Sequence, residues 1–301
     1  MKKFISVIVI MLCCFILFGC EKKDDKKYKV IIPSGTPLIA FGNLLDDENF
    51  DVEVVNGSDP LQAAFVGGEY DIIVAPFNLG AKLYMAGKST YRLESIITTN
   101  NTYLISKVKY DSLDMIKDKT VLAYGAGSMP FVGVKALSDN KELNLQITQL
   151  NSGVADVAAS FLAQKETYDL YMMAEPNLTI LKTKGDLYVI DVAKELNATL
   201  VQACIFVNPE SNVSNTVLKK IKDNINSLNN KPEDYAKSVL NKNDFFKNLG
   251  EENLANAIPN CNIVYKKASE NKDIVNSTYE LLNKYVPNLL NGNTPNEEFI
   301  N

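Results

Sequence analysis

The residues best suited to chemistry in this sequence are short runs of small and polar side chains that follow apolar segments. They are Ser34-Gly35-Thr36, Phe77-Asn78, Gly127-Ser128, Ser152-Gly153 and Glu175-Pro176-Asn177. Glycine lets the backbone approach a ligand closely, and the free N–H groups of a first helical turn carry partial positive charge. Taken singly, each run is more simply a set of helix caps. Five runs at equivalent positions favour a cleft that binds a small molecule.

Composition excludes most catalytic chemistry at these loops. The chain of 301 residues has no histidine, which removes Ser-His-Asp and Cys-His nucleophile systems and imidazole zinc sites. Its single arginine, Arg92, begins a predicted strand away from the loops, so we interpret it as a surface residue. Glu175 is the only acid placed at a cleft loop, whereas glycosidase chemistry needs two. We therefore expect no catalytic residues, no cofactor and no metal.

Nucleotide and nucleic-acid binding are also disfavoured. Gly125-Ala126-Gly127 lacks the third glycine of a dinucleotide fingerprint, and Gly87-Lys88-Ser89 lacks the first glycine of a phosphate loop. The net charge of −5 and the absence of a basic stripe argue against nucleic acid as a partner.

Several aromatic residues fall at or beside the predicted cleft, and two interpretations of them stay open. Phe77, Tyr103, Tyr124, Phe131 and Tyr171 could stack on a flat ring of a ligand, or they could fill the core.

The N-terminus predicts export and a lipid anchor. Lys2 and Lys3 precede an apolar run of 15 residues from Phe4 to Phe18. As a helix this run spans about 22 Å, which is short of a hydrocarbon core of about 30 Å and favours a signal peptide over a membrane span. Leu17-Phe18-Gly19-Cys20 resembles the lipobox of bacterial lipoproteins, which implies cleavage after residue 19, lipidation of Cys20 and a charged tether to residue 27. The alternative is an ordinary secretory signal with an incidental cysteine.

Two further cysteines, Cys204 and Cys261, remain after cleavage. Their apolar, strand-like surroundings favour separate buried thiols, and a disulfide between them is the alternative.

From residue 28 the chain alternates short apolar strands with helical periods, which is typical of an α/β fold. Three strand-loop-helix units lie between residues 28 and 87, and the same pattern begins three more times between residues 120 and 177. We predict two lobes, each a doubly wound sheet. Residues 28–105 and 208–301 would form the first lobe and residues 106–207 the second, with the cleft between them. In open α/β sheets ligands bind at the carboxyl ends of the strands, where the polar loops are found.

The order of these features resembles a known family. The lipobox, the loop Pro33-Ser34-Gly35-Thr36-Pro37, the segment from Leu61 to Asn78 and Ala174-Glu175-Pro176 together resemble substrate-binding lipoproteins of ABC importers. The most similar branch is the nitrate, sulfonate, taurine and thiamine-precursor type, which implies a two-lobed type II periplasmic-binding fold. The sequence lacks the positioned arginine that a strongly anionic solute such as a sulfonate would favour.

The resemblance implies a lipid-anchored, monomeric, non-enzymatic protein on the outer face of the cell membrane, with an ABC-transporter permease as partner. It would capture a small organic or weakly anionic solute. The alternatives are an enzyme on the same fold, of the cofactor-precursor biosynthesis type, or an extracytoplasmic sensor. The implied ligand contacts are Ser34, Gly35, Thr36, Phe77, Asn78, Asn101, Thr102, Gly127, Ser128, Ser152, Gly153 and Glu175.

Overall fold

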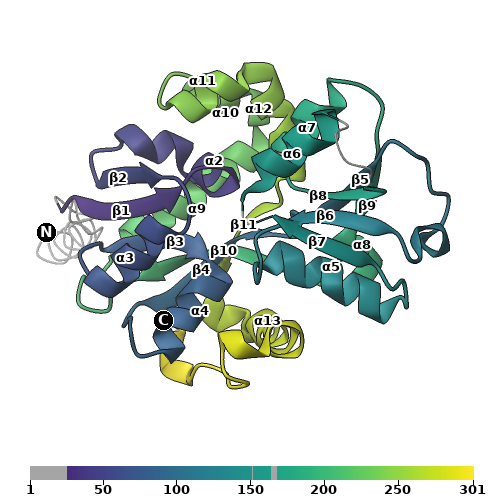
Figure 1. The fold of residues 1–301 in the computed structure, drawn as a ribbon. Helices are drawn as coiled ribbons and strands as arrows, with labels where there is room; N and C mark the ends of the chain where they lie inside the picture. Colours follow the sequence, from purple (N-terminus) through teal and green to yellow (C-terminus); the bar gives the residue numbers. More distant parts are fainter. Residues whose placement is uncertain (1–25, 151, 164–167) are drawn as a thin grey trace, which may run out of the picture.

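The computed structural model describes residues 26–150, 152–163 and 168–301. These residues form two sheets that lie side by side, with helices against each (Figure 1). The predicted signal peptide and Cys20 lie outside the described residues. Along the described chain, no helix combines the length and the apolar character that crossing a membrane needs.

The first sheet has six strands in the order β11-β4-β10-β3-β1-β2. β1 runs parallel to β2 and β3, whereas β10, β4 and β11 continue the sheet in antiparallel pairings. β3 and β10 are apolar along almost their whole length because helices cover both faces of the sheet. The strand bounds are β1 (Tyr28–Pro33), β2 (Phe50–Val55), β3 (Ile72–Pro76), β4 (Arg92–Thr99), β10 (Val201–Val207) and β11 (Ile263–Lys267).

The second sheet has five strands in the order β7-β6-β8-β5-β9. β6 runs parallel to β7 and β8, and β5 pairs antiparallel with β8 and β9. The strand bounds are β5 (Tyr103–Ser106), β6 (Thr120–Tyr124), β7 (Gln146–Leu150), β8 (Leu170–Met173) and β9 (Tyr188–Asp191).

Helices cover both faces of each sheet, so the doubly wound, two-lobed α/β fold predicted from the sequence is confirmed. In the first lobe α2 and α9–α12 bury one face, and α3, α4 and α13 bury the other. In the second lobe α5 and α8 cover one face, and α6 and α7 cover the other. The helix bounds are α2 (Thr36–Phe41), α3 (Asp59–Gly67), α4 (Phe77–Met85), α5 (Met129–Asn140), α6 (Val154–Ala163), α7 (Asn177–Lys182), α8 (Val192–Leu196), α9 (Asn215–Asn230), α10 (Pro232–Val239), α11 (Asp244–Leu249), α12 (Glu251–Ala257) and α13 (Lys272–Tyr285).

The sheets place two strands in the opposite lobe from the one that the sequence assigned. β5 belongs to the second sheet, although most of it falls within residues 28–105, and β10 belongs to the first sheet, although it falls within residues 106–207. The chain therefore crosses between lobes at residues 100–102 and 197–200. The error arose because an apolar strand does not reveal in its own sequence which strand it pairs with. Asn100 and Leu200 join the two crossings, because the Asn100 N–H donates to the Leu200 carbonyl (2.9 Å) and Asn100 Oδ1 accepts from the Leu200 N–H (2.7 Å).

The last part of the predicted tether contacts the first lobe. Lys26 Nζ donates to Asp71 Oδ1 (2.8 Å) and to the Ser211 carbonyl (2.9 Å). Cys204 and Cys261 are both fully buried and unbonded to each other, which confirms the prediction of separate thiols.

Candidate functional site

A cavity of about 300 Å³ lies between the lobes, where the carboxyl ends of β1, β3, β6 and β8 converge. This position agrees with the rule that predicted it, since loops after parallel strands form the crevice of an α/β sheet. The lining residues are Ser34, Gly35, Thr36, Pro37, Pro76, Asn78, Thr98, Asn101, Tyr124, Ser128, Met129, Pro130, Val154, Ala174, Glu175, Pro176, Asn177, Gln202, Ala203 and Phe245.

The structure brings together many of the predicted contact residues around this cavity. Those that line it are Ser34, Gly35, Thr36, Asn78, Asn101, Ser128 and Glu175. They come from loops of both lobes and from the first crossing, so a molecule in the cavity would touch both lobes at once.

Five predicted residues are not in the lining. Phe77 is fully buried and packs against Tyr279, because the first residue of α4 points into the core of the first lobe. Thr102 is also buried, and its hydroxyl accepts from the amide of Gln202, which does line the cavity (2.8 Å). Gly127 contributes its carbonyl to Asn78 Nδ2 (3.1 Å). The other two are Ser152 and Gly153, which are exposed outside the lining.

A buried hydrogen-bond network joins the lobes at the floor of the cavity. Thr36 Oγ1 donates to the backbone carbonyl of Glu175 (2.9 Å), and Asn101 Nδ2 donates to Thr36 Oγ1 (3.0 Å) and to the same carbonyl (3.2 Å). Asn101 Oδ1 accepts from the Glu175 N–H (2.7 Å). The backbone of Glu175, in the second lobe, is therefore held by the first lobe and by the crossing.

Among the described lining residues Glu175 supplies the only carboxylate, and one of its two oxygens has no hydrogen-bond partner there. Its Oε2 accepts from the Thr179 N–H (2.9 Å), whereas its Oε1 is buried with no hydrogen-bond partner among the described residues. Glu175 is 2% exposed, and this burial raises the pKa of its carboxyl, an effect that the Thr179 hydrogen bond and the charge of Lys182 partly offset. None of the described lining residues is a lysine or an arginine.

Asn78 presents a second unpaired acceptor. Its Nδ2 donates across the cleft to the Gly127 carbonyl, while its Oδ1 is buried without a partner in the described part of the chain. Ser128, opposite, caps α5 by accepting from the Phe131 N–H.

Comparison with known proteins gives a match at the level of structure alone. No family model and no curated protein matches the chain. Among solved structures, an ABC transporter from Parabacteroides distasonis is 23% identical with a TM-score of 0.79, covering 92% of this chain and 99% of that one.

Two further solved structures are similar at lower identity. The periplasmic aliphatic sulphonate binding protein SsuA from Escherichia coli is 12% identical with a TM-score of 0.68, covering 90% of this chain and 92% of its own. The Candida albicans CA3427 gene product, described as having the generic periplasmic binding protein fold, is 14% identical with a TM-score of 0.55, covering 91% and 93%. The chain has the periplasmic-binding-protein fold.

Of the five aromatic residues that the sequence placed at or beside the cleft, Tyr124 is the one that lines the cavity. Tyr124 lines it from the end of β6, and burial raises the pKa of its phenol. Tyr103, Phe131 and Tyr171 are buried outside the lining, and the Tyr103 hydroxyl donates to the Asn260 carbonyl (3.0 Å). Arg92 is half-buried at the start of β4 and does not line the cavity.

Thr98, Gln202 and Phe245 are among the lining residues of this inter-lobe cavity that sequence reasoning missed. Thr98 and Gln202 lie in the central strands β4 and β10, and the signal available for them was a polar residue inside an otherwise apolar strand. Phe245 comes from α11, far along the chain, and carried no local signal. A second pocket of about 500 Å³ shares Ser34, Pro176, Asn177 and Phe245 with the cavity, so the two pockets lie next to each other.

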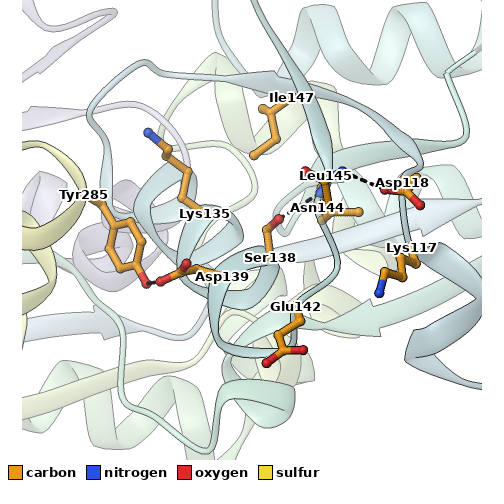
Figure 2. Close-up of a pocket in the computed structure, with 10 residues that line it drawn as sticks. All are labelled: Lys117, Asp118, Lys135, Ser138, Asp139, Glu142, Asn144, Leu145, Ile147 and Tyr285. Atoms are coloured by element: carbon orange, nitrogen blue, oxygen red, sulfur yellow. Dashed lines mark hydrogen bonds between the residues drawn. The ribbon is translucent and has the colours of Figure 1, made fainter.

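A larger pocket of about 570 Å³ lies on the second lobe, between α5, the start of β7 and Tyr285 (Figure 2). Its polar groups pair with one another, since Tyr285 donates to Asp139 Oδ2 (2.9 Å) and Asn144 Nδ2 donates to Asp118 Oδ1 (2.7 Å). Among its described lining residues no buried polar atom lacks a partner. The cavity between the lobes is therefore the stronger candidate site.

Proposed function

We propose that this protein is an extracytoplasmic solute-binding protein that captures a small organic solute in the cavity between its lobes and delivers it to an ABC importer. The observation that carries the proposal is the cavity itself, which is lined by loops of both lobes and by two residues with an unpaired buried acceptor each, Glu175 Oε1 and Asn78 Oδ1. Native structures rarely leave such atoms unpaired, so a bound molecule is the natural partner.

The similarity to a solved ABC transporter over 92% of this chain supports the same proposal. We propose further that the mature protein is a monomer tethered to the cell membrane through lipid on Cys20, with an importer permease as its partner. The lipobox-like residues before Cys20 support this anchor.

The enzyme alternative has no specific observation in its favour. Glu175 is the single carboxylate of the described lining, and groups of three or more side chains placed for a metal ion are absent from the described residues. A hydrolytic site of the glycosidase type needs a second carboxylate facing the first. A solute that is bound and released unchanged is therefore the expected behaviour.

Thermal unfolding of residues 21–301 across a panel of solutes tests the proposal. The panel contains pyrimidines, thiamine precursors, flavins, alkanesulfonates, nitrate and aromatic acids, and the protein is first stripped of ligand by partial unfolding. At a hundred times the dissociation constant, binding adds about 2.7 kcal/mol, which raises the midpoint by roughly 5–10 °C. The solute is recovered afterwards and analysed for conversion.

Two variants locate the binding. Asn78→Leu places apolar bulk in the cavity and should abolish the shift, whereas Lys135→Leu in the larger pocket of Figure 2 should leave it unchanged. A midpoint that no solute raises would contradict solute binding, and a chemically altered solute would favour the enzyme.

A further inference from the structure

Two residues that line the cavity, Glu175 and Asn78, each have one buried acceptor atom without a hydrogen-bond partner in the described part of the chain. Other polar groups of these two residues make hydrogen bonds. Glu175 Oε2 accepts from the Thr179 N–H, the Glu175 N–H donates to Asn101, and the Glu175 carbonyl accepts from Thr36. Asn78 Nδ2 donates to the Gly127 carbonyl. Of the buried side-chain atoms that lack a partner among the described residues, Glu175 Oε1 and Asn78 Oδ1 are the two that belong to lining residues.

These two atoms cannot be exchanged for donors by a simple rotation. Turning the Asn78 amide over would place its oxygen against the Gly127 carbonyl, where two acceptors repel, so the Gly127 contact fixes Oδ1 as the free atom. The Glu175 carboxylate is held at Oε2 by a backbone N–H, and its backbone is held on both sides by the network with Asn101. Both unpaired atoms are therefore acceptors that need a hydrogen-bond donor.

The charge of the described lining also favours a solute that donates hydrogen bonds over an anionic one. Glu175 is the only acidic residue of the described lining, and no lysine or arginine accompanies it there. An anionic solute would have to approach an uncompensated carboxylate in a buried site, where charges interact more strongly than in water. A protonated nitrogen would pair with that carboxylate through a charge-assisted hydrogen bond.

The helix ends at the cavity are compatible with such a solute. α4 and α5 both begin at lining loops, and their first turns carry partial positive charge. Their free N–H groups can donate to a carbonyl oxygen or ring nitrogen at the opposite end of the molecule. The lining beside them contains Met129, Pro130 and Tyr124, which offer an apolar wall to a ring.

The geometry points to a nitrogen-bearing solute, of the amine, amidine or amino-heterocycle class, that donates N–H groups to Glu175 Oε1 and Asn78 Oδ1, and to a cavity that rejects anions. This inference rests on the proposed function, because it assumes that the cavity is where the solute binds. It replaces the weakly anionic solute that the sequence left open.

Three probes of nearly identical shape test the inference: benzamidine, benzamide and benzoate. They differ in whether the group on the ring is a cationic donor, a neutral donor and acceptor, or an anionic acceptor. Binding to the lipid-free chain of residues 21–301 is measured by ligand-observed NMR at neutral pH. We expect dissociation constants in the order benzamidine, benzamide, benzoate, with at least a tenfold difference between the first and the last.

Substitution of the carboxylate should change the order. Glu175→Gln keeps an oxygen for the Thr179 N–H and turns the free position into a donor, so benzamidine should weaken at least tenfold while benzoate binds more tightly. Glu94→Gln is the matched control, because Glu94 is equally buried (1% exposed) but lies on β4 outside the lining, with its Oε2 already paired to Asn301. If Glu175→Gln does not fold, Asn78→Ala should weaken benzamidine several-fold and leave benzoate unchanged.

The outcomes separate this inference from the proposed function. Benzoate binding as tightly as benzamidine, or a wild-type preference that persists in Glu175→Gln, overturns the inference. A solute without any N–H group that raises the unfolding midpoint, while the three probes fail to bind, overturns it and leaves solute binding intact. Failure of every probe and of every solute in the broader panel overturns both.

Discussion

Removing the Asn101 side chain should destabilise the protein more than any other single change at the cavity floor. Asn101 is 3% exposed and supplies both a donor and an acceptor to Glu175, which lies in the other lobe. In Asn101→Ala the Glu175 N–H loses its only partner among the described residues, while the Glu175 carbonyl keeps Thr36 Oγ1. The variant therefore leaves one buried donor orphaned and deletes two further contacts.

The magnitude follows from that difference. An orphaned buried donor costs about 1–3 kcal/mol, and the loss of ordinary hydrogen bonds adds a smaller net amount, so we expect a loss of about 2–4 kcal/mol in the free energy of unfolding. For a chain of this size the midpoint should fall by roughly 5–12 °C. Thr36→Val removes two hydrogen bonds, but Asn101 Nδ2 still donates to the Glu175 carbonyl and the Glu175 N–H keeps Asn101 Oδ1. It should therefore cost less, about 1–2 kcal/mol.

Urea unfolding followed by circular dichroism measures both variants, with Asn177→Ala as the control. Asn177 lines the same cavity but makes no side-chain hydrogen bond with any described residue, so its loss should stay within about 0.5 kcal/mol. Equal costs for Asn101→Ala and Thr36→Val would refute the reasoning, because they would mean that the Glu175 N–H does not depend on Asn101.

Three other changes have outcomes that follow from single contacts. Gly80→Ala should destabilise by about 1–3 kcal/mol, because an added Cβ would overlap the fully buried ring of Phe206, and urea unfolding measures the loss. In residues 21–301 a thiol reagent should detect Cys204 and Cys261 only after unfolding, since both are buried and burial raises the pKa of each thiol. Asp71→Asn should destabilise at neutral pH and progressively less as the pH falls below 3.8, in urea titrations at a series of pH values.

The pH dependence expected for Asp71→Asn follows from the direction in which folding shifts the pKa of Asp71. Burial alone would raise the pKa of Asp71, but hydrogen bonds from Lys26 and from the Lys29 N–H lower it below 3.8. A carboxyl with a depressed pKa in the folded state contributes stability above its unfolded pKa and loses it as the pH falls through the folded value. A difference in the free energy of unfolding between wild type and Asp71→Asn that is constant with pH would contradict this.

Gly153→Ala is the control for Gly80→Ala, because an added Cβ at Gly153 meets nothing within 4 Å.

Local sequence patterns were sufficient for the fold class and for the position of the cavity. Apolar strands followed by glycine and hydroxyl residues, as at Ser34-Gly35-Thr36, fix where a strand ends and a helix begins. The carboxyl ends of parallel strands share one edge of a sheet, so these loops had to converge. The position of the cavity could therefore be predicted without knowing which residues far apart in the sequence contact each other.

What could not be predicted depends on pairing and packing between distant segments. β5 and β10 are both apolar strands, and nothing in their sequences distinguishes the lobe in which each finds its partners. Phe77 stands at a strand end like the true lining residues, yet its ring contacts Tyr279 from α13, some 200 positions along the chain. Phe245 reaches the cavity by the same kind of long-range packing.

In the function that we propose, solute binding and the joint between the lobes would be linked through one residue, Glu175. Its backbone is fixed to the other lobe by Thr36 and to the crossing by Asn101, while Oε1 of its side chain is buried without a partner among the described residues. A donor bound at Oε1 would satisfy the one polar atom of Glu175 that the protein leaves unpaired. It would thereby stabilise the arrangement in which the lobes meet. Because this coupling acts through the charge of the carboxylate, Glu175→Gln should weaken the rise in unfolding midpoint that a cationic ligand produces, whereas Thr36→Val, which leaves the carboxylate in place, should lower stability with and without ligand by a similar amount.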